Sequence, residues 1–138
     1  MDTRHELVTL LAERSARRGH FVLSSGKTSS LYIDARLTTM SPEGLALIGP
    51  LALAAINDAF GKVDAVGGLT LGADPISYAI AYASARTRSP VRACTVRKEP
   101  KSHGAGRQVE GPFVSGDRVV VIDDVITTGG SALKAIEV

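Results

Sequence analysis

The sequence predicts an α/β fold with a mainly parallel central sheet and helices on both of its faces. Short apolar segments with β-forming residues alternate with helical segments along the chain, which is the pattern of βαβ units. Residues 119–122 are four consecutive apolar β-formers, as in a strand buried on both faces of a parallel sheet. The chain has 138 residues, of which 44% are hydrophobic, so residues 1–138 are expected to form a single domain with one core.

The amino-terminal part begins with an amphipathic segment. Residues 4–17 have helical periodicity with basic residues near the carboxyl end, and Gly19 is expected to end the helix. Residues 20–23 and 31–34 are expected to form short strands on either side of a Ser/Gly turn.

A second helix is expected to start at Ser41, because Ser is a good cap and Pro42 fits the first turn. Its apolar stripe extends to about Phe60 and comprises Leu45, Ile48, Ala52, Ala55 and Ala59.

The remaining segments complete the alternation. Residues 63–67, 91–96 and 119–123 predict strands, and residues 75–84 predict a helix. Residues 98–107 contain Pro, Gly and several charges and predict a mobile loop, with Val109 and Val114 in a hairpin around it. Residues 131–138 start a helix without a stop signal, so we expect that the C-terminal part of the fold is missing from this chain.

Composition restricts the classes of partner and compartment. The net charge of +2 is too small to indicate nucleic acid, whereas the basic residues within 86–107 suit a phosphorylated substrate. No apolar run has the length expected of a membrane span, and the charged amino terminus is unlike a signal peptide. The single cysteine, Cys94, excludes an intramolecular disulfide and is expected to be a buried, inert thiol, so we predict a cytoplasmic protein.

The most informative chemistry follows the strand at residues 119–122. Asp123 and Asp124 lie where ligands bind in open α/β sheets, at the carboxyl end of a strand. The sequence Thr-Thr-Gly-Gly-Ser at 127–131 can surround a phosphate with N–H groups and hydroxyls at a helix start. Because acids repel phosphate, the pair suits sugar hydroxyls, a metal ion or a developing cation, which together predict a sugar-phosphate site. The alternative is a glycine-rich turn in which one Asp caps the next helix.

Residues 119–131 resemble the phosphoribosyl-pyrophosphate signature of the type I phosphoribosyltransferases. Three other segments are similar to the orotate phosphoribosyltransferases in particular: residues 21–27 with 32–34, residues 67–75, and residues 97–104. The four motifs occur in the family's order.

The resemblance implies a type I phosphoribosyltransferase fold with a small N-terminal hood region. It implies transfer of the 5-phosphoribosyl group from phosphoribosyl pyrophosphate to orotate in pyrimidine biosynthesis, giving orotidine 5'-monophosphate and pyrophosphate. Mg²⁺ is the implied cofactor. A homodimer is also implied, because the family's mobile loop acts across the subunit interface.

The resemblance also implies residue roles. The catalytic group comprises Lys101, His103, Asp123 and Asp124, and both acids would contact Mg²⁺ through its waters. Phosphoribosyl pyrophosphate would be bound by that group and by Lys27, Thr70, Leu71, Gly72, Ala73, Arg97, Lys98, Val125, Ile126, Thr127, Thr128, Gly129, Gly130 and Ser131. Orotate would be bound by Tyr32, Ile33 and Thr127.

Some positions keep a second interpretation or depart from the family. Asp74 and Pro75 fit a helix start as well as the pyrophosphate loop. Ser24 stands where some orotate enzymes have a pyrophosphate-contacting lysine, and Lys27 is a candidate to compensate. The arginine that binds the orotate carboxylate lies beyond residue 138 in the family. Two alternatives stay open, a purine-base phosphoribosyltransferase and a non-catalytic sensor of phosphoribosyl pyrophosphate.

Overall fold

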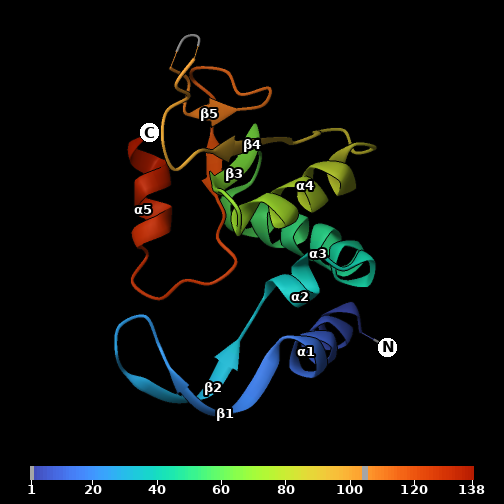
Figure 1. The fold of residues 1–138 in the computed structure, drawn as a ribbon. Helices are drawn as coiled ribbons and strands as arrows, with labels where there is room; N and C mark the ends of the chain where they lie inside the picture. Colours follow the sequence, from blue (N-terminus) through green and yellow to red (C-terminus); the bar gives the residue numbers. More distant parts are fainter. Residues whose placement is uncertain (1, 104–105) are drawn as a thin grey trace.

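The computed structural model describes residues 2–103 and 106–138 (Figure 1). The amino-terminal hood consists of α1 (Thr3–Arg14) and an antiparallel hairpin of β1 (Ala16–Val22) and β2 (Thr28–Ile33). Asp2 caps α1 by accepting a hydrogen bond from the Arg4 N–H. The expected helix end at Gly19 is wrong: α1 already ends at Arg14, because residues 16–22 form β1 and pair with β2.

The hood is joined to the body through α2 (Arg36–Thr39), a short helix that the sequence did not predict. The hydroxyls of Ser15 and Thr38 share a buried 2.7 Å hydrogen bond, and the Asp34 N–H donates to the Ser15 carbonyl at 2.9 Å. The first bond fastens the start of the hairpin to α2, and the second joins the two ends of the hairpin to each other.

The long helix α3 (Pro42–Phe60) begins as expected, with the Ser41 hydroxyl accepting from the Gly44 N–H at 3.1 Å. Its stripe differs from the prediction. Ile48, Gly49 and Ile56 are buried, whereas Ala55 and Ala59 are exposed, because Gly49 allows the backbone of α4 to approach closely.

The central sheet comprises β3 (Ala65–Leu69), β4 (Arg92–Val96), β5 (Val109–Glu110) and β6 (Val119–Val121), in the order β5-β4-β3-β6. Strands β4, β3 and β6 are parallel and β5 is antiparallel to β4. Helices α3 and α4 (Ala73–Ser84) lie on one face and α5 (Gly130–Glu137) lies on the other (Figure 1). The predicted fold class is therefore confirmed, although Val114 lies outside the strands.

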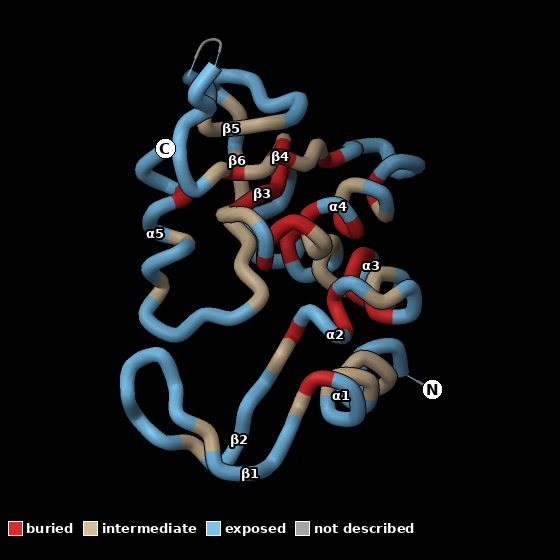
Figure 2. Tube along the Cα trace, viewed as in Figure 1, coloured by how far each residue is buried: buried red, intermediate tan, exposed pale blue. Residues whose placement is uncertain are grey.

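The core lies between the sheet and the α3–α4 layer, where buried residues concentrate (Figure 2). Ile56, Val63, Val66, Ile80 and Val91 form its central cluster. Strand β6 is only half-buried, contrary to the expectation of burial on both faces. It pairs with β3 alone among the described strands and is therefore an edge of this sheet.

Helix α3 also corrects the expectation about apolar runs. An 18-residue window within its 19 residues has a mean hydropathy of 1.3, which is enough in length and composition for a membrane span. A core helix passes the same test, and α3 packs against both α4 and α1. This packing accounts for part of its apolar composition, since 28% of that window is buried.

Candidate active site

The acid pair lies directly beyond the end of β6. The Ile122 N–H donates to the Gly67 carbonyl at 2.8 Å, so pairing with β3 continues to the residue before Asp123. The Asp124 N–H donates to Asp123 Oδ1 at 2.9 Å, and the Val125 N–H donates to Asp124 Oδ1 at 3.0 Å. Partial burial, followed by the neighbouring Asp124 carboxylate, raises the pKa of Asp123. A site that disfavours two adjacent negative charges is suited to hydroxyl donors or a cation.

The predicted pyrophosphate loop, residues 70–73, lies against the Asp123–Asp124 pair. A Cβ added at Gly72 would lie 2.7 Å from the Asp124 Cγ, so only glycine allows the present approach. The loop follows β3, as the acid pair follows the adjacent β6, and its Thr70–Leu71 peptide bond is cis. Both segments therefore lie at the carboxyl ends of two adjacent parallel strands, β3 and β6.

The segment at residues 125–131 leads from the acids into α5. Its residues are exposed apart from the half-buried Gly129, which has φ 82° and is the residue before the helix. The positive φ explains a glycine at this position. The first N–H groups of α5 have no partner within the helix, which gives them the character of an anion site.

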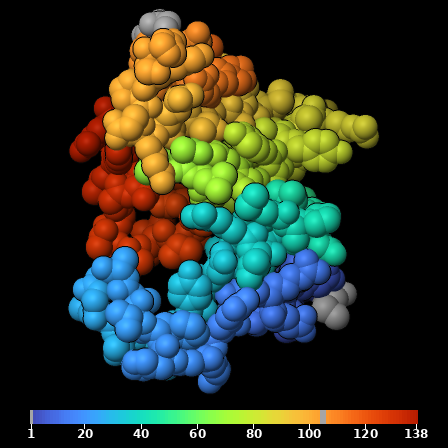
Figure 3. All heavy atoms as spheres, in the orientation of Figure 1, coloured from blue at the N-terminus to red at the C-terminus, as the bar shows by residue number. Residues whose placement is uncertain are grey.

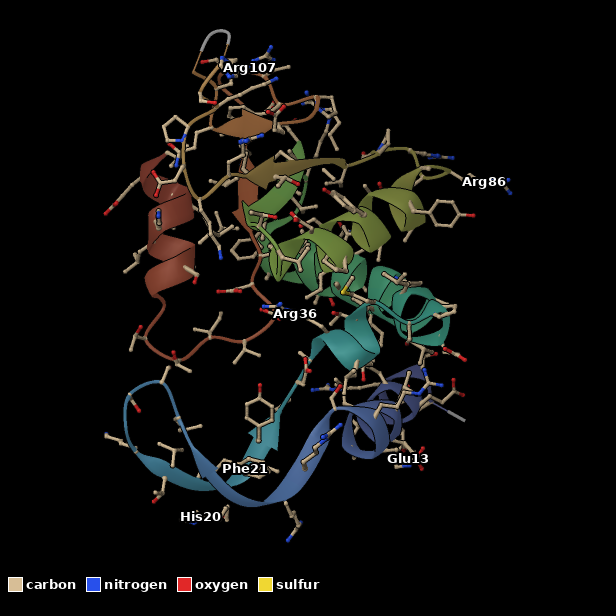
Figure 4. The ribbon with its side chains drawn as sticks, in the orientation of Figure 1. Glu13, His20, Phe21, Arg36, Arg86 and Arg107 are labelled. Carbon is tan, nitrogen blue, oxygen red and sulfur yellow. The ribbon has the colours of Figure 1, made fainter. Side chains whose placement is uncertain are left out.

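Arg36 is the residue at this site that sequence reasoning missed. Its Nε lies 3.9 Å from Asp124 Oδ2. Figure 4 shows it reaching from α2 towards the segment after β6. The signal available in the sequence was its place a few residues after Tyr32 and Ile33, which were expected to bind orotate.

The predicted mobile loop and the preceding Arg97 carry several positive charges and are called the cationic loop below. This loop is closed at its base by hydrogen bonds between backbone groups. The Arg97 N–H donates to the Gln108 carbonyl at 2.8 Å and the Lys101 N–H donates to the Arg107 carbonyl at 3.1 Å. Lys98, Lys101 and His103 are exposed.

The loop stands away from the acid pair of its own chain. Figure 4 places Arg107 at one end of the molecule, with Arg36 near the middle. The structure therefore brings together the acid pair, the 70–72 loop and the 127–131 segment, but not Lys101 and His103. Gly104, expected to help the loop to move, lies outside the described residues.

The hood supplies the third group of predicted residues. Tyr32 and Ile33 are about half exposed on β2, and the Tyr32 ring packs on Phe21 with centroids 5.4 Å apart. The surface is hollowed between the hood and the segment that leads into α5 (Figure 3). Lys27 lies in the exposed hairpin turn with Ser24, and the structure shows no contact between Lys27 and the acid pair.

Comparisons with known proteins match this arrangement. No family model matches the chain. The chain is 47% identical over 137 residues to an orotate phosphoribosyltransferase of Aquifex aeolicus, covering 97% of this chain and 74% of that protein. The chain belongs to the orotate phosphoribosyltransferase family.

Solved structures agree with this assignment. The Mycobacterium tuberculosis orotate phosphoribosyltransferase in complex with Fe(III) dicitrate superposes with a TM-score of 0.83 at 42% identity, covering 99% of this chain and 75% of that one. The same enzyme in complex with phosphoribosyl pyrophosphate gives a TM-score of 0.79 at 40% identity, covering 99% and 73%. The predicted family, fold and enzyme class, an orotate phosphoribosyltransferase, are thus confirmed.

Asp74 differs from its interpretation as a helix cap. Gly72 occupies the position before α4, and Asp74 lies within the first turn. Its carboxylate accepts from the hydroxyls of Thr70 at 2.6 Å and Thr95 at 2.9 Å. These tertiary contacts could not be predicted from the local sequence, since Thr95 lies on β4.

Proposed function

We propose that this chain transfers the 5-phosphoribosyl group from phosphoribosyl pyrophosphate to orotate, releasing orotidine 5'-monophosphate and pyrophosphate. The observation that carries the proposal is the packing of Gly72 against Asp124 at the carboxyl edge of the sheet. This packing supports a site in which the 70–73 loop holds pyrophosphate beside a ribose bound by Asp123 and Asp124, as the transfer requires. The M. tuberculosis relative that was solved with phosphoribosyl pyrophosphate supports the same ligand.

The reaction breaks the bond between C1 of the ribose and pyrophosphate, while a ring nitrogen of orotate forms the new bond to C1 and gives up its proton to the leaving pyrophosphate or to water. The sugar ring gains positive, oxocarbenium-like character in the transition state. Asp123 and Asp124 would accept hydrogen bonds from the ribose hydroxyls and stabilise this charge. N–H groups of residues 127–131 would hold the 5-phosphate, and those of residues 70–73 would hold pyrophosphate.

The residues at the strand end also fit Mg²⁺. Mg²⁺ prefers oxygen ligands and keeps several waters, so two partly exposed carboxylates together with substrate oxygens are a sufficient donor set. Asp123 and Asp124 would hold the ion through its waters, where it would neutralise charge on the pyrophosphate group. The raised pKa of Asp123 agrees with a site that gains from a nearby cation.

Leaving pyrophosphate also needs cationic donors, which we assign to Arg97, Lys98, Lys101 and His103. Lys and Arg donors act more strongly where water is excluded. The Lys101 N–H donates to the Arg107 carbonyl, and Arg107 lies at one end of the molecule, away from Arg36 (Figure 4). This supports a homodimer in which Lys101 and His103 serve the partner's site, whereas Arg97, at the base of the loop, directly follows β4 and stays with the site of its own chain.

Mixing two inactive variants tests this arrangement. Lys101→Ala and Asp124→Asn chains should together regain activity, because one mixed site then has both groups intact. Activity that stays at the level of the separate variants would contradict a site shared between subunits.

The proposed activity is tested by incubating the chain with phosphoribosyl pyrophosphate, Mg²⁺ and one base at a time, with chromatographic detection of the nucleotide. We expect orotidine 5'-monophosphate from orotate and no nucleotide from uracil, adenine or hypoxanthine. A nucleotide from a purine would favour the purine enzyme. Binding of the sugar donor without any product would favour a sensor.

The cytoplasm remains the predicted compartment, and residues 1–138 remain predicted to be one domain.

A further inference from the structure

The carboxylate of Asp74 joins two segments that the proposed function places at the pyrophosphate group. It is 7% exposed, and each of its oxygens faces a hydroxyl. Thr70 belongs to the pyrophosphate loop after β3. Thr95 belongs to β4, two residues before Arg97 and the cationic loop.

The geometry excludes two simpler roles. Among the described residues, no backbone N–H donates to the Asp74 carboxylate, so it does not cap α4. An ionised carboxylate only accepts hydrogen bonds, and both oxygens already face donors, so Asp74 cannot serve as a ligand for an anion. Its hydrogen bonds instead fix the positions of Thr70 and Thr95.

Further bonds extend the network in both directions. The Thr70 N–H donates to the Val96 carbonyl at 2.9 Å, so the loop is also held to the end of β4. The hydroxyls of Tyr78 and Thr95 share a 2.6 Å bond, which adds α4 to the same group. Buried hydrogen bonds to a charged group are among the stronger ones in proteins, so this network resists displacement of the loop.

We propose that Asp74 is a positioning residue that holds the 70–72 loop and the base of the cationic loop at a fixed separation, matched to pyrophosphate. This inference rests on the proposed pyrophosphate site, and it adds a residue that touches neither substrate nor metal. Loosening the network should weaken interactions with pyrophosphate selectively and leave orotate recognition by the hood unchanged.

Three variants and a control separate positioning from general stability. Asp74→Asn keeps the shape of the side chain and removes its charge. Thr95→Val removes one hydroxyl at nearly constant volume, and Thr95→Ser restores it. Ser84→Ala is the matched control, because the buried Ser84 hydroxyl joins the opposite end of α4 to Val91, accepting from its N–H at 2.8 Å.

The readouts are the Kd of inorganic pyrophosphate with Mg²⁺ by calorimetry, and the KM values for phosphoribosyl pyrophosphate and orotate. Loss of a hydrogen bond to a charged group predicts an increase of roughly tenfold in the Kd and the first KM for Asp74→Asn and Thr95→Val. We expect Thr95→Ser to restore both values, because serine keeps the hydroxyl. In Ser84→Ala the pyrophosphate Kd and both KM values should stay within about twofold of wild type, because Ser84 bonds Val91 and neither of the two pyrophosphate segments. The orotate KM should stay within the same range in every variant.

Three results would overturn the inference. They are an unchanged pyrophosphate Kd in folded Thr95→Val, an equal weakening in Ser84→Ala, and no binding of pyrophosphate by the wild-type chain. If Asp74→Asn does not fold, the Thr95 pair still decides. Failure of the proposed function is distinguishable, because it would appear as intact pyrophosphate binding without turnover of orotate.

Discussion

Substitution of Gly72 by alanine tests the contact between the pyrophosphate loop and the acid pair. Ordinary van der Waals contact begins near 3.4 Å, whereas the new Cβ would lie 2.7 Å from the Asp124 Cγ. The carboxylate must therefore retreat by at least about 0.7 Å, since repulsion rises steeply within contact distance. That movement weakens its 3.0 Å bond from the Val125 N–H.

The expected magnitude follows from that bond. A hydrogen bond to a charged group is worth about 1.5–3 kcal/mol. If Asp124 stabilises the transition state, displacing it should lower kcat/KM by roughly 10- to 100-fold. The assay is steady-state formation of orotidine 5'-monophosphate, with the denaturation midpoint measured on the same preparations.

A double-mutant cycle identifies the cause of the effect. When Asp124 is alanine, the substitution Gly72→Ala should cost much less stability than in the wild-type chain, because the clashing carboxylate is gone. Strictly additive losses of stability would refute the clash. Unchanged kcat/KM in Gly72→Ala would refute the role given to Asp124.

Three other variants give separate tests. Lys101→Ala should lower kcat by about 100-fold or more with little change in melting temperature, because the side chain is exposed and the Lys101 backbone bond persists; a fully active variant would remove its role. Arg36→Gln should raise the KM for phosphoribosyl pyrophosphate a few-fold and change stability by at most about 1 kcal/mol, since the ion pair with Asp124 is long and the Arg36 side chain is exposed, and Arg36→Lys should partly restore binding. A bond from the Val114 N–H, with the Arg92 guanidinium, lowers the pKa of Asp117, so wild type should be more stable than Asp117→Asn above about pH 4, with the difference vanishing as pH falls through that lowered pKa; equal denaturation curves at neutral pH would contradict this.

Local sequence signals were sufficient where chemistry and secondary structure are both local. The cap at Ser41, the strand before Asp123 and the glycine-rich segment into α5 were each predicted from adjacent residues. The expected burial of Cys94 is also confirmed, and burial raises the pKa of its thiol.

Predictions failed where distant pairing decides the outcome. Residues 16–19 have a helical pattern, but pairing of β1 with β2 includes them in the hairpin. Strand β6 has the composition of a central strand and lies at an edge. Arg36 and Asp74 gained their roles only through contacts across elements, which periodicity cannot show.

The most direct test compares the wild-type chain with the double variant Asp123→Asn, Asp124→Asn. Both are supplied with orotate, phosphoribosyl pyrophosphate and Mg²⁺, and orotidine 5'-monophosphate is measured over time. We expect product from the wild-type chain and a rate lower by at least about 100-fold from the folded variant, since both groups at the developing charge are neutralised. Equal rates, or no product from the wild-type chain, would contradict the proposed site.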